Sequence, residues 1–143
     1  MAHAELLCAA RGQRLTPLRR KVLETLAGSH RTLGAYEIMD RLAGQGPRPA
    51  PITVYRALDF LLEQGLVHRI ESRNAFLACI GDHGELAAAA TTVFLICERC
   101  GAVGEASSAA VAKTLQAAAR AAGFTPKARV IEVTGVCAHC RKG

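Results

Sequence analysis

Apolar residues recur at every third or fourth position through most of the first 65 residues, which places them on one face of a helix. The longest series predicts a helix over residues 53–64. Its apolar members are Val54, Ala57, Leu58, Leu61 and Leu62. Shorter series predict helices over residues 3–12, 17–27 and 35–42.

Capping and turn residues mark the ends of these helices. Thr16 and Pro17 provide a capping hydroxyl and a first-turn proline, and Gly28 ends the helix that they begin. Residues 44–51 (GQGPRPAP) are rich in glycine and proline, so they are predicted to form a loop before the 53–64 helix.

A β-hairpin is predicted after the last helix. Two strand-like runs, residues 67–71 and 75–79, flank the turn residues Ser72-Arg73-Asn74. Three helices followed by a hairpin is the order of a winged helix-turn-helix, whose last helix enters the major groove of DNA.

Candidate DNA contacts lie at the N-terminal end of that last helix, at Thr53, Tyr55 and Arg56. An arginine there can pair with guanine, and hydroxyl groups can contact phosphates. The same residues also fit an exposed helix start, and Tyr36 fits a partly buried surface ring. The order of elements alone leaves both interpretations open.

The composition changes after the hairpin. Residues 81–92 (GDHGELAAAATT) are small and of low complexity, as in a hinge. Strands are predicted beyond them over residues 93–97, 102–105 and 128–136, with an alanine-rich helix over residues 111–122.

These elements predict an α+β fold in two domains. A winged helix-turn-helix DNA-binding domain would occupy residues 1–80, and a hinge would occupy residues 81–92. A small α/β domain would occupy residues 93–143. Because this second domain has few bulky core residues, we expect it to bury its strand edge or helix against a second copy, in a homodimer.

Four cysteines occur in two CxxC pairs, Cys97/Cys100 and Cys137/Cys140, with 36 residues between the pairs. Each pair directs two thiolates to one point, and four thiolates form a closed tetrahedral zinc site. Such a site has no open position for chemistry, so the zinc is interpreted as structural. Disulfides and a redox CxxC are the alternatives.

Charge and composition narrow the class of protein. The net charge is +6, and residues 1–80 contribute +4, from 11 Lys/Arg and 7 Asp/Glu. The positive charge of residues 1–80 suits a protein that binds the DNA backbone, although solvated helix faces also carry clusters of basic residues.

No apolar run approaches the ~20 residues of a membrane span. Residues 1–14 lack signal-peptide features, so we expect a cytoplasmic protein with reduced cysteines and no membrane contact.

The stretch TVYRALDFLLEQGLVH over residues 53–68, together with CERCG over residues 97–101, resembles the ferric uptake regulator family. The likeness is greatest to its zinc-sensing branch, the zinc uptake regulators, and it extends from Arg14 to Cys140. The resemblance implies a homodimeric transcriptional repressor that binds a palindromic DNA operator. It also implies a C-terminal dimerisation domain, a cysteine-bound structural zinc and a regulatory metal site at the hinge.

The resemblance assigns roles to individual residues. The structural zinc ligands would be the four cysteines of the two CxxC pairs. The residues implied as DNA contacts are Tyr36, Tyr55 and Arg56, with backbone contacts at Arg14, Arg19 and Arg20.

For the regulatory zinc, the branch uses a histidine after the recognition helix, a cysteine at the end of the wing, a hinge histidine and a glutamate after the first CxxC. His68, Cys79 and Glu105 match three of these positions. A mixed set of sulfur, nitrogen and oxygen ligands suits tetrahedral zinc.

The hinge departs from the family pattern. Relatives carry histidines where this chain has Ala87–Ala90, and the one histidine in the hinge is His83. We expect His83 to supply the fourth ligand, with Asp82, Glu85 or a water molecule as alternatives.

The sequence thus predicts a zinc-responsive repressor of zinc uptake genes, in which hinge zinc sets the spacing of two recognition helices. A sensor of iron, manganese, nickel or peroxide is one alternative, and a metal-independent winged-helix protein with only structural zinc is another. An enzyme with a small-molecule substrate is not expected. Neither CxxC follows a proline as in zinc deaminases, and no Ser-His-Asp or phosphate-loop pattern occurs.

Overall fold

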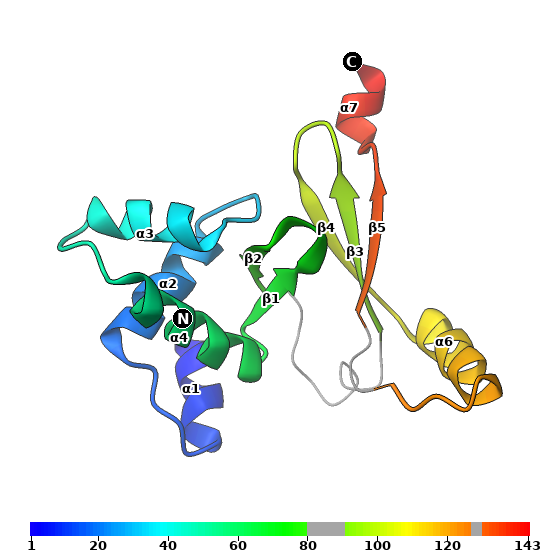
Figure 1. The fold of residues 1–143 in the computed structure, drawn as a ribbon, viewed down its shortest axis with the longest axis horizontal. Helices are drawn as coiled ribbons and strands as arrows, with labels where there is room; N and C mark the ends of the chain where they lie inside the picture. Colours follow the sequence, from blue (N-terminus) through cyan, green and yellow to red (C-terminus); the bar gives the residue numbers. More distant parts are fainter. Residues whose placement is uncertain (80–90, 127–129) are drawn as a thin grey trace. The chain divides into compact units, whose positions relative to one another are not determined.

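The computed structural model describes residues 1–79, 91–126 and 130–143 (Figure 1). The chain forms two compact units, Met1–Cys79 and Ile80–Gly143. Within the described residues, no helix has the length and apolar character needed to cross a membrane.

The first unit contains four helices, α1 (Ala2–Ala10), α2 (Pro17–Ala27), α3 (Ala35–Ala43) and α4 (Pro51–Glu63). All four contribute to one apolar core. The side chains with no exposed surface come from the positions that the helical period selects. They include Val22, Ile38, Met39, Val54, Leu58 and Leu61. The winged-helix order and the α+β class predicted from the sequence are confirmed.

Local signals set the ends of α2 as predicted. The Thr16 hydroxyl accepts a hydrogen bond from the Arg19 N–H at 3.5 Å, Pro17 occupies the first turn and Gly28 is the C-cap. The start of α4 differs from the prediction, because the helix begins at Pro51, the last residue assigned to the loop and two residues before the predicted start. A proline suits the first helical turn, where its missing N–H has no partner to lose.

The wing is a two-stranded antiparallel sheet of β1 (Val67–Ile70) and β2 (Ala75–Ala78). Each strand is one residue shorter than predicted, because a 3-10 turn occupies Glu71–Arg73 and Cys79 follows β2. Asn74 closes the turn in the left-handed region at φ 46°, which asparagine tolerates better than most residues. Two backbone hydrogen bonds, at 2.8 and 2.9 Å, join Phe76 of the wing to Leu33 in the segment between α2 and α3.

Three arginines near the start of the chain are engaged within the first unit. Arg11 Nη1 donates to the carbonyl of Gln64, the C-cap of α4, at 2.9 Å. The Arg19 guanidinium lies 3.5 Å from the centre of the Phe60 ring, also on α4. Arg20 forms an ion pair with Glu5 of α1. Arg11 and Arg19 therefore both contact the C-terminal half of α4 and help to fix its position.

We expect Arg11→Ala to lower the free energy of unfolding of the first unit by about 0.3–1 kcal/mol, because a cation at a helix C-terminus is stabilising by that amount at an exposed site. Urea denaturation followed by circular dichroism measures this change. Arg14→Ala is the matched control, since Arg14 is exposed and its side chain lies outside the contacts described above. Equal losses in the two variants would show that Arg11 has no special role.

The second unit is built on a three-stranded sheet with strand order β4-β3-β5. The central strand is β3 (Thr91–Cys97), which pairs antiparallel with β4 (Val103–Ser108) and parallel with β5 (Val130–Gly135). The parallel pairing places Cys97 opposite Gly135, so the two CxxC pairs meet at one end of the sheet. The helix α6 (Ala109–Ala121) connects β4 to the chain before β5.

The second unit differs from the prediction at its element boundaries. Thr91 and Thr92, assigned to the hinge, are the first residues of β3, where they pair with Ser108 and Ser107. The rest of the predicted hinge, residues 81–90, lies outside the described residues. The strand predicted over residues 102–105 is β4, at Val103–Ser108. Cross-strand pairing therefore outweighs the low strand propensity of Gly104, Ala106 and the serines.

The sequence also predicted the bounds of the C-terminal elements only approximately. The helix predicted over residues 111–122 begins two residues earlier, where the Ser108 hydroxyl caps the Val111 N–H at 3.2 Å. The described part of the strand predicted over residues 128–136 is β5. The short helix α7 (Ala138–Lys142), which carries the last cysteine, was not predicted.

Candidate metal centres and nucleic-acid interface

The four cysteines of the CxxC pairs form one cluster in the second unit. Cys97 ends β3 and Cys100 follows in a turn, while Cys137 caps the N-terminus of α7 and Cys140 lies within it. Their four sulfur atoms all lie within 4.8 Å of one another. The Cys100 and Cys137 sulfurs are 3.8 Å apart. A tetrahedral site with Zn–S bonds of about 2.3 Å has sulfur–sulfur edges of about 3.8 Å, so the cluster fits zinc.

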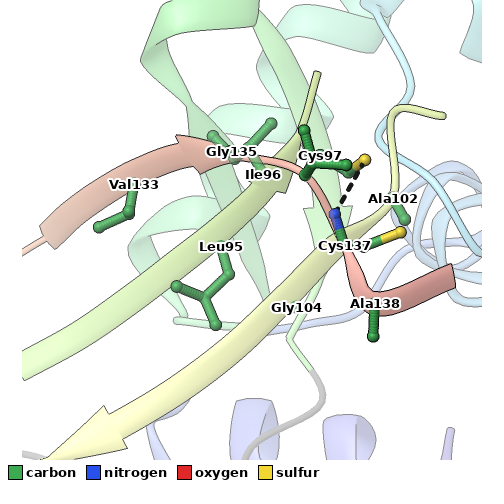
Figure 2. Close-up of a pocket in the computed structure, with 10 residues that line it drawn as sticks. Leu95, Ile96, Cys97, Ala102, Gly104, Val133, Gly135, Cys137 and Ala138 are labelled. Carbon is green, nitrogen blue, oxygen red and sulfur yellow. Dashed lines mark hydrogen bonds between the residues drawn. The ribbon is translucent and has the colours of Figure 1, made fainter. Parts of the chain in front are cut away.

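Hydrogen bonds from the backbone and from one arginine side chain fix the geometry of the cysteine cluster. The Cys137 N–H donates to the Cys97 sulfur at 3.4 Å, as Figure 2 shows. Gly101, at φ 76°, turns the chain after the first pair, and its N–H donates to the Cys97 carbonyl at 3.0 Å. The Arg99 guanidinium donates to the Cys140 carbonyl at 3.0 Å and so links the two pairs. Sequence reasoning missed Arg99, because CxxC spacing carries no signal about the residues between the cysteines.

Two thiols of the cluster, Cys97 and Cys140, have shifted pKa values. Hydrogen bonds from the backbone N–H groups of Cys100 and Cys137 lower the pKa of Cys97 to about 6. Hydrogen bonds to the side chains of Cys137 and Cys100 raise the pKa of Cys140 to about 12. Zinc must therefore displace protons from this cluster as it binds, and zinc affinity falls as the pH is lowered. All six cysteines lie in the described part of the chain, and none forms a disulfide.

A pocket of about 410 Å³ lies beside the cysteine cluster, over one face of the sheet (Figure 2). Its walls are mainly apolar and include Leu95 of β3 and Val133 of β5, whose side chains are about half exposed. A second apolar groove of about 440 Å³ runs along α6, where Val111 and Leu115 face Ile131. The second unit therefore presents apolar surface on both its sheet and its helix.

The wing brings together two of the residues expected at the regulatory metal. His68 lies in β1, and Cys79 directly follows β2, where its N–H donates to the Leu66 carbonyl at 2.9 Å. A ring nitrogen of His68 and the Cys79 sulfur lie within 4.8 Å of each other, so one ion could bind both. Both side chains are half-buried.

The other two residues expected at that metal belong to other parts of the chain. Glu105 lies in β4 of the second unit, opposite Phe94 of β3, and is half-buried. His83 lies outside the described residues, as do the alternative ligands Asp82 and Glu85.

The residues expected to contact bases are exposed on the first unit. Tyr55 is 40% exposed, Tyr36 on α3 is 63% exposed, and Thr53 and Arg56 are also exposed. Because α4 begins at Pro51, Thr53 lies inside the first turn rather than at the helix start. The structure adds Ile52, which is 63% exposed on the same turn and was not singled out from the sequence.

The three arginines expected to contact the DNA backbone have different surroundings. Arg14 is exposed, whereas Arg19 and Arg20 are half-buried and bind Phe60 and Glu5. The contacts of these three arginines with DNA stay a prediction. Arg14 is the best placed of them to contact a phosphate, because its side chain is exposed.

Comparisons with known proteins agree on one family. Residues 10–134 match the model of the ferric uptake regulator family. The zinc uptake regulation protein of Escherichia coli (strain K12) is 42% identical over 140 residues, which cover 98% of this chain and 80% of that protein. The peroxide operon regulator of Bacillus subtilis (strain 168) is 31% identical over 134 residues, with 92% and 86% covered. A solved zinc uptake regulator in complex with zinc and DNA superposes with a TM-score of 0.90 at 42% identity, covering 99% of this chain and 92% of that one.

Proposed function

Because this chain belongs to the ferric uptake regulator family, we propose that it is a zinc-responsive, DNA-binding transcriptional repressor of zinc uptake and homeostasis genes. The observation that carries the proposal is the pairing of His68 with Cys79 at the base of the wing, in a chain 42% identical to a zinc uptake regulation protein. That pair sits on the same unit as the recognition helix, so metal binding there can act on DNA binding.

Two zinc ions per protomer are proposed, with different roles. The first is held by Cys97, Cys100, Cys137 and Cys140 and is structural, since four protein ligands leave no open position. The second is regulatory and is held by His68 and Cys79 of the first unit, Glu105 of the second, and His83.

The donor set of the regulatory site favours zinc over harder ions. A thiolate from Cys79 and an imidazole from His68 are soft or borderline ligands that suit zinc, whereas iron(II) and manganese(II) sensors use sites richer in oxygen and nitrogen.

By joining residues from both units, the regulatory zinc would reduce the freedom of the winged helix to move against the second unit. The expected gain in DNA affinity is about 1–3 kcal/mol, the usual size of an allosteric coupling energy.

DNA binding is proposed to run through α4. Its buried face, with Val54 and Leu58 at 0% exposure, fixes the helix on the core and leaves Tyr55 and Arg56 outward. Arg56 has the length and donors to pair with a guanine in the major groove. The net charge of +4 on residues 1–80 favours contact with phosphates.

A homodimer is proposed through the second unit. Among the described residues of this unit, five large apolar side chains are substantially exposed, namely Leu95, Val111, Phe124, Val130 and Val133. The outer edge of β5 and the groove along α6 can each be covered by the same surface of a second copy. Two winged helices related by a two-fold axis would then contact the two halves of a palindromic operator.

No catalytic role is proposed. A closed four-cysteine site leaves no position for a reacting water, and His68 and Cys79 (the wing pair) are proposed to bind the regulatory metal. The chain is therefore proposed to act by binding DNA, without turnover of a small-molecule substrate.

The test measures zinc content and DNA binding together. The zinc-loaded protein first enriches a duplex from a random DNA pool, and anisotropy then follows binding to that duplex while a chelator lowers free zinc. We expect two zinc ions per protomer to fall to one, with DNA affinity lost as the second ion leaves. Arg56→Ala is the control for the DNA face, with an expected loss of about 1–3 kcal/mol.

Other outcomes would replace the proposal. One zinc per protomer throughout, with DNA binding that does not depend on free zinc, would indicate a metal-independent winged-helix protein. Recovery of DNA binding by iron or manganese but not by zinc would indicate a different metal sensor.

A further inference from the structure

Ile52 is an exposed aliphatic side chain in a position where packing gives it no role. It lies in the first turn of α4, is 63% exposed, and is not part of the apolar core of the first unit. Isoleucine is only a moderate helix former, and the first helical turn favours acidic or capping side chains. The side chain therefore has no evident benefit for the fold itself.

The neighbours of Ile52 show which surface it shares. Ile52, Tyr55 and Arg56 are spaced at i, i+3 and i+4, so they lie on one face of α4. The positions between and after them, Val54 and Ala57, are buried at 0% and 4% exposure and fix the rotation of the helix. Ile52 thus belongs to the same outward face as the proposed base-reading arginine.

The chemistry of an isoleucine limits what it can recognise on DNA. It has no hydrogen-bond donor or acceptor, and the one apolar group on the base edges of the major groove is the 5-methyl of thymine. Ile52 precedes Arg56 by four residues, which is about 6 Å along the helix axis at about 1.5 Å per residue. Base steps are about 3.4 Å apart, so this distance corresponds to one or two steps.

We propose that Ile52 is a specificity-determining residue that contacts the 5-methyl group of a thymine, one or two base steps from the base that Arg56 contacts. This inference rests on the proposed binding of DNA by α4. It adds a position in the operator at which thymine is selected by its methyl group rather than by hydrogen bonds.

The experiment is a double-mutant cycle between the protein and the DNA methyl group. The full-length, zinc-loaded protein is bound to the duplex that it enriches from a random pool, and each thymine of a half-site is replaced in turn by deoxyuridine. At one position we expect wild-type affinity to fall about fourfold, the effect of one lost methyl contact. Ile52→Ala should bind the thymine duplex about fourfold more weakly than wild type and show no further loss with deoxyuridine.

Leu6→Ala is the matched control. Leu6 is 70% exposed on α1, so its truncation also removes a surface aliphatic group. We expect this variant to keep the wild-type sensitivity to deoxyuridine at every position. The melting temperature of each variant is measured alongside, because an exposed side chain should leave it unchanged.

Two results would overturn the inference while leaving DNA binding intact. One is a wild-type protein that is insensitive to deoxyuridine at every position, and the other is Ile52→Ala with the full wild-type sensitivity. Failure of the zinc-loaded wild type to enrich any duplex would instead overturn the proposed function, and this inference with it.

Discussion

Replacement of Cys137 by serine should release the zinc of the four-cysteine cluster and unfold the second unit. Structural zinc sites contribute about 10–16 kcal/mol of apparent binding free energy at neutral pH, which exceeds the stability of a small domain. The dependence on metal should be strong here, because the buried apolar residues described in this unit are few, namely Phe94, Ile96, Cys97 and Ala112. Metal analysis should show one zinc fewer per protomer, and light scattering should show loss of the dimer.

The first unit should survive this substitution. Its core is built from α1 to α4 and contains no cysteine of the cluster, so a cooperative unfolding transition should remain in circular dichroism. Cys8→Ala is the control, because it removes a buried thiol from the first unit and should leave zinc content unchanged. A Cys137→Ser protein with wild-type zinc content and an unchanged dimer would show that the cluster does not hold the metal.

The second large effect is expected at the wing. Cys79→Ser should retain the structural zinc and both folded units but lose the zinc-dependent gain in DNA affinity, about 5–150-fold for a coupling of ~1–3 kcal/mol. A serine hydroxyl is a poor zinc ligand at neutral pH, whereas a cysteine thiolate is a strong one. Anisotropy titrations at high and low free zinc measure the loss directly.

His68→Gln should reproduce the Cys79→Ser result, because both residues are proposed ligands of one ion. His30→Gln is the matched control, since His30 is an exposed histidine of the same unit. If Cys79→Ser still responded to zinc as the wild type does, the regulatory ion would have to bind elsewhere, and the assignment of the wing pair would be wrong.

The sequence predicted best what depends on neighbours along the chain. Helical period and local caps located α2 and α3 closely, and the Thr16 cap is present as predicted. The start of α4 was missed by two residues, because Pro51 fits both a loop and a first helical turn. The CxxC spacing identified the four-cysteine cluster, since each pair carries its own local turn.

What the sequence could not predict depends on contacts between distant residues. The extension of β4 to Ser108 comes from pairing with β3, and α7 is too short to show a helical period. The family resemblance grouped Arg14 with Arg19 and Arg20 as backbone contacts, yet the last two bind Phe60 and Glu5. Ile52 was overlooked because exposure is a tertiary property that a periodic pattern does not carry.

The parallel pairing of β3 with β5 also sets the order in which a refolding chain gains structure. Cys97 and Gly135 are partners in this pairing although they are 38 positions apart in sequence. Parallel, non-local pairing is slow, because loop closure costs entropy before any contact compensates for it. The helical first unit forms from local contacts and should fold first. The second unit completes its folding only when zinc binds, and until then its strand edges stay unpaired and prone to aggregation. A cell short of zinc would therefore be short of the assembled protein as well.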